Sequence, residues 1–343
     1  MRIPQRVLII RPGALGDTIL ALPAVSVLRR AWPDAEFCWV GYPASLEWLK
    51  GTPYLNDCRS IDSRLFCHLF DGTRDDALGD FLCQYDYCVA WVRDSEISAA
   101  PGIHRIFEDR CLLAAPFPRE GAGVHASDHL LQTLRGIADA QVWNALADAR
   151  TESPLRKVRF PKETALECAF CPPQVMIHPG SGDRRKCWPI ERFQAVAEAL
   201  QAQAGAETCW VLGPADLHLI GELQRYCDRN NMKLITGAAL RELALLLRGM
   251  RIYLGNDSGV THLSAALGIE TWAMFGPTSP KEWAPPGNHV HTFWLPEAMP
   301  PMPDDPSATT GKKGELERIT PKMVIDSILN ALAIRTKGIQ NER

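Results

Sequence analysis

The chain contains 343 residues, of which 46% are apolar and 22% are charged, and its formal net charge is −3. This length predicts about two domains with separate cores, and the composition excludes global disorder. The absence of a basic domain argues against a nucleic-acid partner. Because no apolar stretch reaches the roughly 18 residues of a membrane span and the N-terminal apolar run is too short for a signal peptide, we expect a soluble cytoplasmic protein.

The first part of the chain predicts a βαβ unit. A buried strand at Val7–Ile10 leads into a glycine turn at Pro12–Gly16, and a helix from Asp17 to Ala31 is followed by a strand at Phe37–Val40. This order is typical of a parallel sheet. Further elements of the same kind are expected near Ile61 (strand), at Tyr87–Trp91 (strand) and around His129–Ala140 (helix).

A polar, proline-containing stretch at residues 156–173 predicts a linker between a first domain, 1–155, and a second domain, 174–318. Strands and helices then alternate again, which predicts a second parallel, doubly wound sheet. The expected strands are Val175–His178, Thr208–Leu212, Lys233–Ile235, Ile252–Leu254 and Thr271–Phe275, and the expected helices are Pro189–Ala204, a helix ending near Asn230, Leu240–Arg248 and a helix ending at Leu267. The chain is thus α/β, with two sheets facing a cleft that receives ligands at the carboxyl ends of the strands.

The C-terminal part predicts a proline-rich loop at residues 296–314 and a last helix at Pro321–Ala333, within a segment 319–334. Residues 335–343 are expected to form a frayed tail.

Asp17 follows the first strand and a turn that contains Gly13, Ala14 and Gly16. Its carboxylate can take a proton from an attacking hydroxyl. Asp is also a favoured helix N-cap, worth ~0.5–2 kcal/mol, and spacing alone favours this structural role over a catalytic one. The turn lacks the third glycine of the dinucleotide fingerprint, which disfavours a Rossmann dehydrogenase.

The segment after the strand ending at His178 predicts half of an anion site. Its glycines allow a phosphate to approach the backbone, while Ser181 offers a hydroxyl and Lys186 a positive charge. The alternative for Lys186 is a solvated basic loop.

The other half is predicted at Asp257–His262, after the strand Ile252–Leu254. Ser258 can cap a helix that Gly259 begins and Gly268 ends. The unpaired N–H groups at the helix start favour a diphosphate, with His262 one turn farther on. The alternative for His262 is a buried, hydrogen-bonded helix residue.

Two aspartates have open assignments. Asp257 can accept from a ribose hydroxyl, orient its turn, or close an Asx turn on its own backbone. Asp216, in the turn Gly213–Asp216, offers a carboxylate to a ribose diol, or serves only the turn.

No metal site is expected. Cys168 and Cys171 have no second pair, and the chain contains no Asp-x-Asp. The charge of a departing diphosphate must then be stabilised by Lys186, His262 and helix N-termini.

Five segments together resemble glycosyltransferase family 9, whose best-known members are ADP-heptose:lipopolysaccharide heptosyltransferases. They are VLIIRPGALGDTILALPAVSVLRRAWP, HPGSGDRRKCWPIERF, LGNDSGVTHLSAALG, MFGPTSPKEWAP and ITPKMVIDSIL, in that order. The resemblance implies a B-type glycosyltransferase (GT-B) with two Rossmann-like domains, the acceptor in the first and the nucleotide-sugar in the second. It also implies that the helix in 319–334 crosses back to the first domain.

The resemblance assigns roles to residues by motif position. Asp17 matches the catalytic base, with Gly13, Ala14 and Gly16 as the turn on the acceptor side. The positions that match donor-binding residues are Ser181, Lys186, Asp216, Asp257, Ser258, Gly259 and His262.

The resemblance further implies inverting transfer from a nucleotide-sugar, ADP-heptose above all, to a phosphorylated inner-core saccharide of lipopolysaccharide. It implies no metal or other cofactor, and peripheral association with the inner membrane. Arginines between residues 42 and 125 are acceptor candidates: Arg64, Arg93, Arg105 and Arg119. Two alternatives remain open: a B-type transferase or epimerase that uses a different nucleotide-sugar such as a UDP-sugar, and a non-catalytic member that binds a nucleotide-sugar or glycan.

Overall fold

The computed structural model describes residues 3–71, 75–93, 101–119, 121–137, 139–146, 155–156, 158, 174–295 and 315–341. The chain divides into unit 1, which comprises Met1–Ala165 and Lys281–Trp283, and unit 2, which comprises Leu166–Pro280 and Ala284–Arg343. The division after Ala165 falls within the predicted linker, 156–173, most of which lies outside the described residues. The predicted loop at 296–314 also lies outside them.

Unit 1 contains a five-stranded parallel sheet in the order β3-β2-β1-β4-β5. Its strands are β1 (Arg6–Ile10), β2 (Glu36–Gly41), β3 (Asp57–Ser60), β4 (Tyr87–Trp91) and β5 (Cys111–Ala114). The central strand β1 is buried over Val7–Ile10, because helices cover both faces of the sheet. Runs of buried β-branched and aliphatic residues are what such a strand requires.

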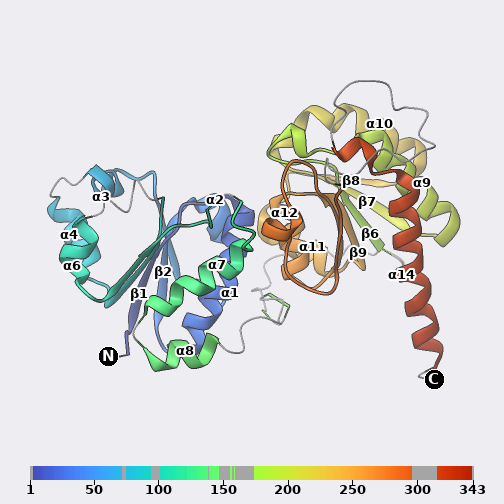
Figure 1. The fold of residues 1–343 in the computed structure, drawn as a ribbon. Coiled ribbons are helices and arrows are strands. Elements are labelled where there is room, and N and C mark those ends of the chain that lie inside the picture. The colour runs from blue at the N-terminus through green and yellow to red at the C-terminus, as the bar shows by residue number, and fades with distance from the viewer. Residues whose placement is uncertain are drawn as a thin grey trace. The chain divides into compact units, whose positions relative to one another are not determined.

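The helices of unit 1 form two layers (Figure 1). One layer contains α1 (Leu15–Ala31), α7 (Ala126–Thr133) and α8 (Ala140–Leu146), and the other contains α3 (His68–Asp71), α4 (Asp76–Leu82) and α6 (Pro101–Phe107). Shorter elements are α2 (Pro43–Leu46) and the 3₁₀ turns Glu47–Leu49, Arg64–Phe66 and Leu134–Gly136. The predicted helix around His129–Ala140 is thus two helices separated by a 3₁₀ turn, since Gly136 weakens a continuous helix.

Unit 2 contains a six-stranded parallel sheet in the order β11-β10-β9-β6-β7-β8. Its strands are β6 (Gln174–His178), β7 (Glu207–Leu212), β8 (Lys233–Thr236), β9 (Ile252–Asn256), β10 (Glu270–Met274) and β11 (Val290–Phe293). In chain order this is the 3-2-1-4-5-6 arrangement of a doubly wound fold, with its switch point between β6 and β9. The predicted α/β class with two parallel sheets is confirmed.

The longer helices of unit 2 are α9 (Ile190–Ala204), α10 (Ile220–Asn230), α11 (Leu240–Arg248), α12 (Gly259–Ala266) and α14 (Pro321–Asn341). The shorter elements are α13 (Pro280–Trp283), at the division between the units, and the 3₁₀ turns Arg184–Lys186, Pro214–Leu219 and Glu315–Arg318. Left-handed residues end two of these helices, Gly205 after α9 and Asn231 after α10.

Helix α14 lies beside α9 (Figure 1), and its Val324 and Ile328 belong to the core of unit 2. The expected return of this helix to the first domain stays a prediction. The helix continues to Asn341, beyond Arg335 where the frayed tail is expected to begin. Its sequence after Pro321 contains no further proline to end it.

The fold brings the predicted site segments to the carboxyl ends of central strands. The glycine turn follows β1 in unit 1, and the segments beginning at Pro179 and Asp257 follow β6 and β9 in unit 2. A switch point between such strands is where ligands bind in doubly wound sheets. Within the described ranges, no helix is long and apolar enough to cross a membrane.

Candidate functional site

The start of helix α12 follows the predicted pattern. Ser258 is the N-cap, in extended conformation, and its Oγ accepts a hydrogen bond from the Thr261 N–H at 3.4 Å. Gly268, after the helix, has φ of +82°, which a residue without a side chain adopts readily. The first N–H groups of α12, beginning with Gly259, have no acceptor inside the helix and carry its positive dipole end. This half-exposed turn can therefore bind an anion.

Lys186 lies beside this turn. Its Nζ donates to Asp257 Oδ2 at 2.7 Å, with the lysine side chain 25% and the aspartate side chain 7% exposed. Thr278 Oγ1 donates to the same oxygen at 2.6 Å, and His262 Nε2 lies 3.9 Å from Asp257 Oδ1. Lys186, Thr278 and His262 thus all lie around the Asp257 carboxylate at the N-terminus of α12. Of the roles open to Asp257, orienting the turn is the one that these contacts support.

Three further hydrogen bonds connect the segment after β6 with the end of β9. The Ser181 hydroxyl donates to the Asp257 carbonyl at 2.8 Å. The fully buried Asn256 side chain donates to the Pro179 carbonyl at 2.6 Å and accepts from the Trp188 N–H at 2.9 Å. Because both ends of the loop are fixed, Lys186 is presented from a rigid support.

Asp216 is buried and is engaged by groups of its own unit. It is 4% exposed, and its Oδ2 lies 3.1 Å from His178 Nε2 and accepts from the Gly213 N–H at 3.1 Å. A Cβ at Gly180 would overlap the carboxyl group, so the aspartate fills space that only glycine leaves. In the structure Asp216 is therefore a buried partner of His178, and its ribose role stays a prediction that these contacts do not support.

Asp17 is the third residue of α1, and Ala14 is the N-cap. The carboxylate Oδ2 accepts from the Ala14 N–H at 3.0 Å, so the aspartate does cap the helix, but from inside its first turn. A Cβ at Gly13 would lie 2.8 Å from the Asp17 Cβ, which explains the glycine there. Gly16 lies inside α1 as its second residue and not in the turn. Asp17 is half-buried, and its described bond leaves Oδ1 for a substrate.

Arg11 lies beneath this turn and carries no sequence signal of its own. It is 1% exposed, its Nε donates to the Asp17 carbonyl at 3.3 Å, and its Nη1 donates to the Pro116 carbonyl at 3.2 Å. Its guanidinium carbon also lies 5.2 Å from the centre of the Phe117 ring. Burial lowers the pKa of Arg11 to about 10, although the charge of Asp17 acts in the opposite direction. A buried cation thus supports the turn that carries the predicted base.

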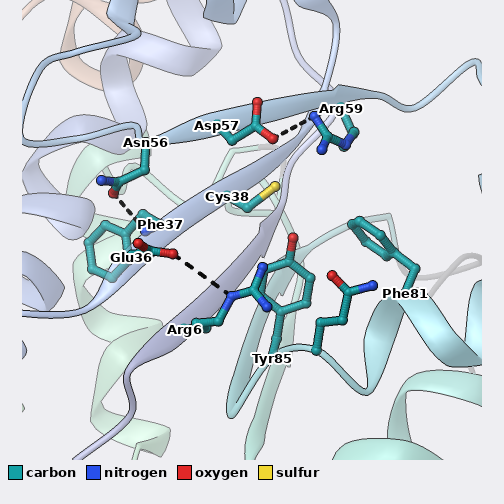
Figure 2. A pocket seen from close by; sticks show the side chains of 10 residues that line it. Arg6, Glu36, Phe37, Cys38, Asn56, Asp57, Arg59, Phe81 and Tyr85 are labelled. Carbon is teal, nitrogen blue, oxygen red and sulfur yellow. Dashed lines mark hydrogen bonds and ion pairs between the residues drawn. The ribbon is translucent and has the colours of Figure 1, made fainter.

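Unit 1 also contains a small hollow at the opposite end of its sheet, near the first residues of β1 and β2 (Figure 2). Its charged side chains are paired, Arg6 with Glu36 at 3.9 Å and Arg59 with Asp57 at 2.5 Å. The Arg6 guanidinium lies over the Tyr85 ring at 5.0 Å. Because these charges are compensated and no predicted site residue lines the hollow, we assign it no ligand.

The structure also offers no metal site in the part of the chain that it describes. Within the residues that the structure describes, no three His, Cys, Asp or Glu side chains group as metal ligands would. Cys168 and Cys171 lie outside the described residues.

The fold and the site can now be compared with known proteins. Residues 124–310 match the family model described as Glycosyltransferase family 9 (heptosyltransferase). Lipopolysaccharide heptosyltransferase 3 of Escherichia coli is 24% identical over 297 residues, which cover 81% of this chain and 86% of that protein. Lipopolysaccharide heptosyltransferase 1 of Pseudomonas aeruginosa is 24% identical over 291 residues, 80% of each chain.

Two solved structures share the fold. A family 9 glycosyl transferase from Veillonella parvula superposes with a TM-score of 0.71 at 20% identity, covering 96% of this chain and 97% of that one. The Escherichia coli heptosyltransferase WaaC with ADP has a TM-score of 0.64 at 16% identity, covering 95% and 99%. These matches confirm the predicted B-type glycosyltransferase fold. Since the family model covers more than half of the residues, the chain belongs to glycosyltransferase family 9 and is a heptosyltransferase-like glycosyltransferase.

Proposed function

We propose that the protein transfers a heptosyl group from ADP-heptose to a hydroxyl of a phosphorylated inner-core saccharide of lipopolysaccharide, with inversion and without a metal ion. The observation that carries the donor half of this proposal is the Lys186 ammonium, held 2.7 Å from Asp257 beside the N-terminus of α12. A mobile cation and a row of open N–H groups are what a diphosphate leaving group needs. We choose ADP as the nucleotide of the donor, since a solved structure that shares this fold is described with ADP.

The reaction divides between the two units. In unit 2, the diphosphate takes over Lys186 from Asp257 and receives hydrogen bonds from the first N–H groups of α12, with His262 adjacent. These groups stabilise the negative charge that grows on the diphosphate as the glycosidic bond breaks, which takes the place of a divalent metal ion.

In unit 1, Asp17 Oδ1 accepts the proton of the acceptor hydroxyl as that oxygen attacks the anomeric carbon, from the face opposite the leaving ADP. A carboxylate is a weak base toward an alcohol. It suffices because the hydroxyl becomes acidic only as its bond to an oxocarbenium-like carbon forms. Gly13 allows Asp17 its position, and the buried Arg11 supports the turn from below.

The positive charge of exposed arginines in unit 1 favours an acceptor that carries phosphate. The four arginines of unit 1 that are acceptor candidates are all exposed: Arg64, Arg93, Arg105 and Arg119. Guanidinium groups bind phosphate monoesters in bidentate fashion, so a phosphorylated saccharide matches this unit better than a neutral one. Such an acceptor is carried by a lipid, and peripheral contact with the inner membrane belongs to the same proposal.

The test is product analysis. Purified protein, ADP-heptose and a panel of truncated lipid acceptors, with and without phosphate groups, are incubated in the presence of EDTA. We expect one heptose to be added to a phosphorylated acceptor, with inverted configuration and with undiminished yield in EDTA. Transfer only from UDP- or GDP-sugars would refute the donor, inhibition that Mg²⁺ reverses would refute the metal-free scheme, and binding of ADP-heptose without transfer or hydrolysis would indicate a non-catalytic member.

A further inference from the structure

Behind the α12 turn lies a chain of three polar side chains from three different strand ends. The Asp216 carboxylate lies 3.1 Å from His178 Nε2, and His178 Nδ1 lies 3.4 Å from Ser258 Oγ. His178 and Asp216 are each 4% exposed, whereas Ser258 is half-exposed and forms the turn itself. The chain therefore connects the buried interior of unit 2 with the N-cap of the helix.

Two glycines are required for this arrangement. A Cβ at Gly180 would overlap the carboxyl group of Asp216, closer than real Cβ atoms come to any neighbour. A Cβ at Gly255 would overlap the hydroxyl end of Tyr253, which hydrogen-bonds Thr261 Oγ1 at 3.1 Å, and would lie 2.9 Å from the His178 carbonyl. Gly180 thus leaves space for the carboxyl group at the buried end of the network, and Gly255 leaves space for the Tyr253 hydroxyl that contacts Thr261 beside it.

The direction of each hydrogen bond follows from the charge at the buried end. Burial raises the pKa of Asp216, but the hydrogen bonds from His178 and from the Gly213 N–H outweigh it and lower the pKa overall. An ionised carboxylate can only accept, so Nε2 of His178 carries the proton. In the neutral ring Nδ1 is then an acceptor, and the Ser258 hydroxyl donates to it.

Thr261 offers the Ser258 proton a second acceptor, because its Oγ1 lies 3.2 Å from Ser258 Oγ. That oxygen already hydrogen-bonds Tyr253 OH, and its own proton goes to the Asn256 carbonyl. Donation from Ser258 to His178 gives the buried Nδ1 acceptor a donor, and it leaves the contacts of Thr261 Oγ1 with Tyr253 and Asn256 in place.

We propose that His178, held by Asp216, is a positioning residue for donor binding: its Nδ1 accepts a hydrogen bond from the Ser258 hydroxyl, so that Ser258 Oγ caps the Thr261 N–H and does not donate to the ligand. The inference rests on the proposed function and deepens it. The diphosphate is recognised by the N–H groups of Gly259 and Val260 and by Lys186, while the serine hydroxyl fixes the turn that presents them.

The test is a double-mutant cycle on ADP binding, measured by calorimetry. His178→Gln keeps an N–H at the Nε2 position for Asp216 but offers Ser258 no acceptor, and we expect a dissociation constant about tenfold higher. His178→Asn, which keeps an acceptor at the Nδ1 position, should bind ADP more tightly than the Gln variant. Ser258→Ala should cost no more than a helix cap, about fivefold, and in that background His178→Gln should change affinity less than about twofold.

Three results would overturn the proposal: an equal effect of His178→Gln in both backgrounds, equal affinity of the Gln and Asn variants, or a loss of about 100-fold or more with Ser258→Ala. Circular dichroism checks that each variant is folded. A measurement on the unmodified protein does not depend on the variants. The ¹⁵N shifts of the His178 ring should show a proton on Nε2 and none on Nδ1, and a proton on Nδ1 would overturn the inference. If the unmodified protein does not bind ADP, the proposed function fails. The measurement on the His178 ring still tests whether Nδ1 accepts the hydrogen bond from Ser258.

Discussion

The substitution Gly180→Ala tests the network through stability. The added Cβ would overlap the carboxyl group of Asp216, and the loop that carries it is fixed by Asn256 and Ser181, so the aspartate must move. Movement breaks its contacts with His178 and with the Gly213 N–H. Hydrogen bonds to a charged group contribute about 1.5–3 kcal/mol each, so we expect a loss of at least about 3 kcal/mol.

The assay is thermal or urea unfolding of the purified protein, with the transition of unit 2 followed by its tryptophans. A loss of this size lowers the midpoint by about 6–12 °C for a unit of this length. Gly182→Ala is the matched control, because nothing lies within 4 Å of a Cβ there. Equal stability of the two variants would refute the reasoning. In an Asp216→Ala background, Gly180→Ala should cost little, since the overlap is gone.

Three other predictions concern charge. Asp17→Asn keeps an acceptor for the Ala14 N–H, so the unfolding midpoint should be nearly unchanged while kcat falls at least ~100-fold, about 2.7 kcal/mol of barrier; near-normal turnover would leave only the cap. Lys186→Ala leaves Asp257 without its cation and should weaken ADP binding by about 10- to 100-fold in calorimetry, whereas Arg184→Ala, an exposed charge on the same turn, should not. The folded-state pKa of Asp216 lies below its unfolded value. The stability that it contributes is therefore present above about pH 4 and is lost as pH falls through the folded pKa. Asp216→Asn should flatten acid unfolding, and an unchanged acid limb would contradict the assigned shift.

The central strands could be predicted from sequence because burial on both faces leaves a strong pattern. Val7–Ile10, Tyr87–Trp91 and Val175–His178 agree with β1, β4 and β6 within one residue at each end. The strands that sequence reasoning missed, β5 and β11, lie at sheet edges. Their residues are only half-buried, so β5 (Cys111–Ala114) lacks the continuous burial of a central strand. An edge strand is specified mainly by its neighbour, which a single sequence does not display.

The donor-side residues were predictable for a related reason. Carboxyl ends of neighbouring parallel strands meet, so polar turns after two central strands predict a shared site, and the structure brings Lys186, Asp257 and His262 together there. The roles of Asn256 and Thr278 were not predictable, because their partners are distant in sequence. In the sequence, such distant contacts are marked only by the glycines whose lack of a side chain leaves space for them.

Asp17, Asp216 and Asp257 all follow strand ends, and a pattern cannot separate them, but their surroundings do. The charge of Asp216 is directed at His178 and the Gly213 N–H inside the unit, and that of Asp257 at Lys186 and Thr278. A base must offer a substrate an oxygen that the protein has not already used. The described hydrogen bonds of all three carboxylates use Oδ2, but Asp216 and Asp257 are buried, whereas Asp17 is half-exposed. Among these three, Asp17 is therefore the one whose remaining oxygen a substrate can reach. The proposal that Asp17 is the base is therefore supported by its exposure as well as by the family likeness.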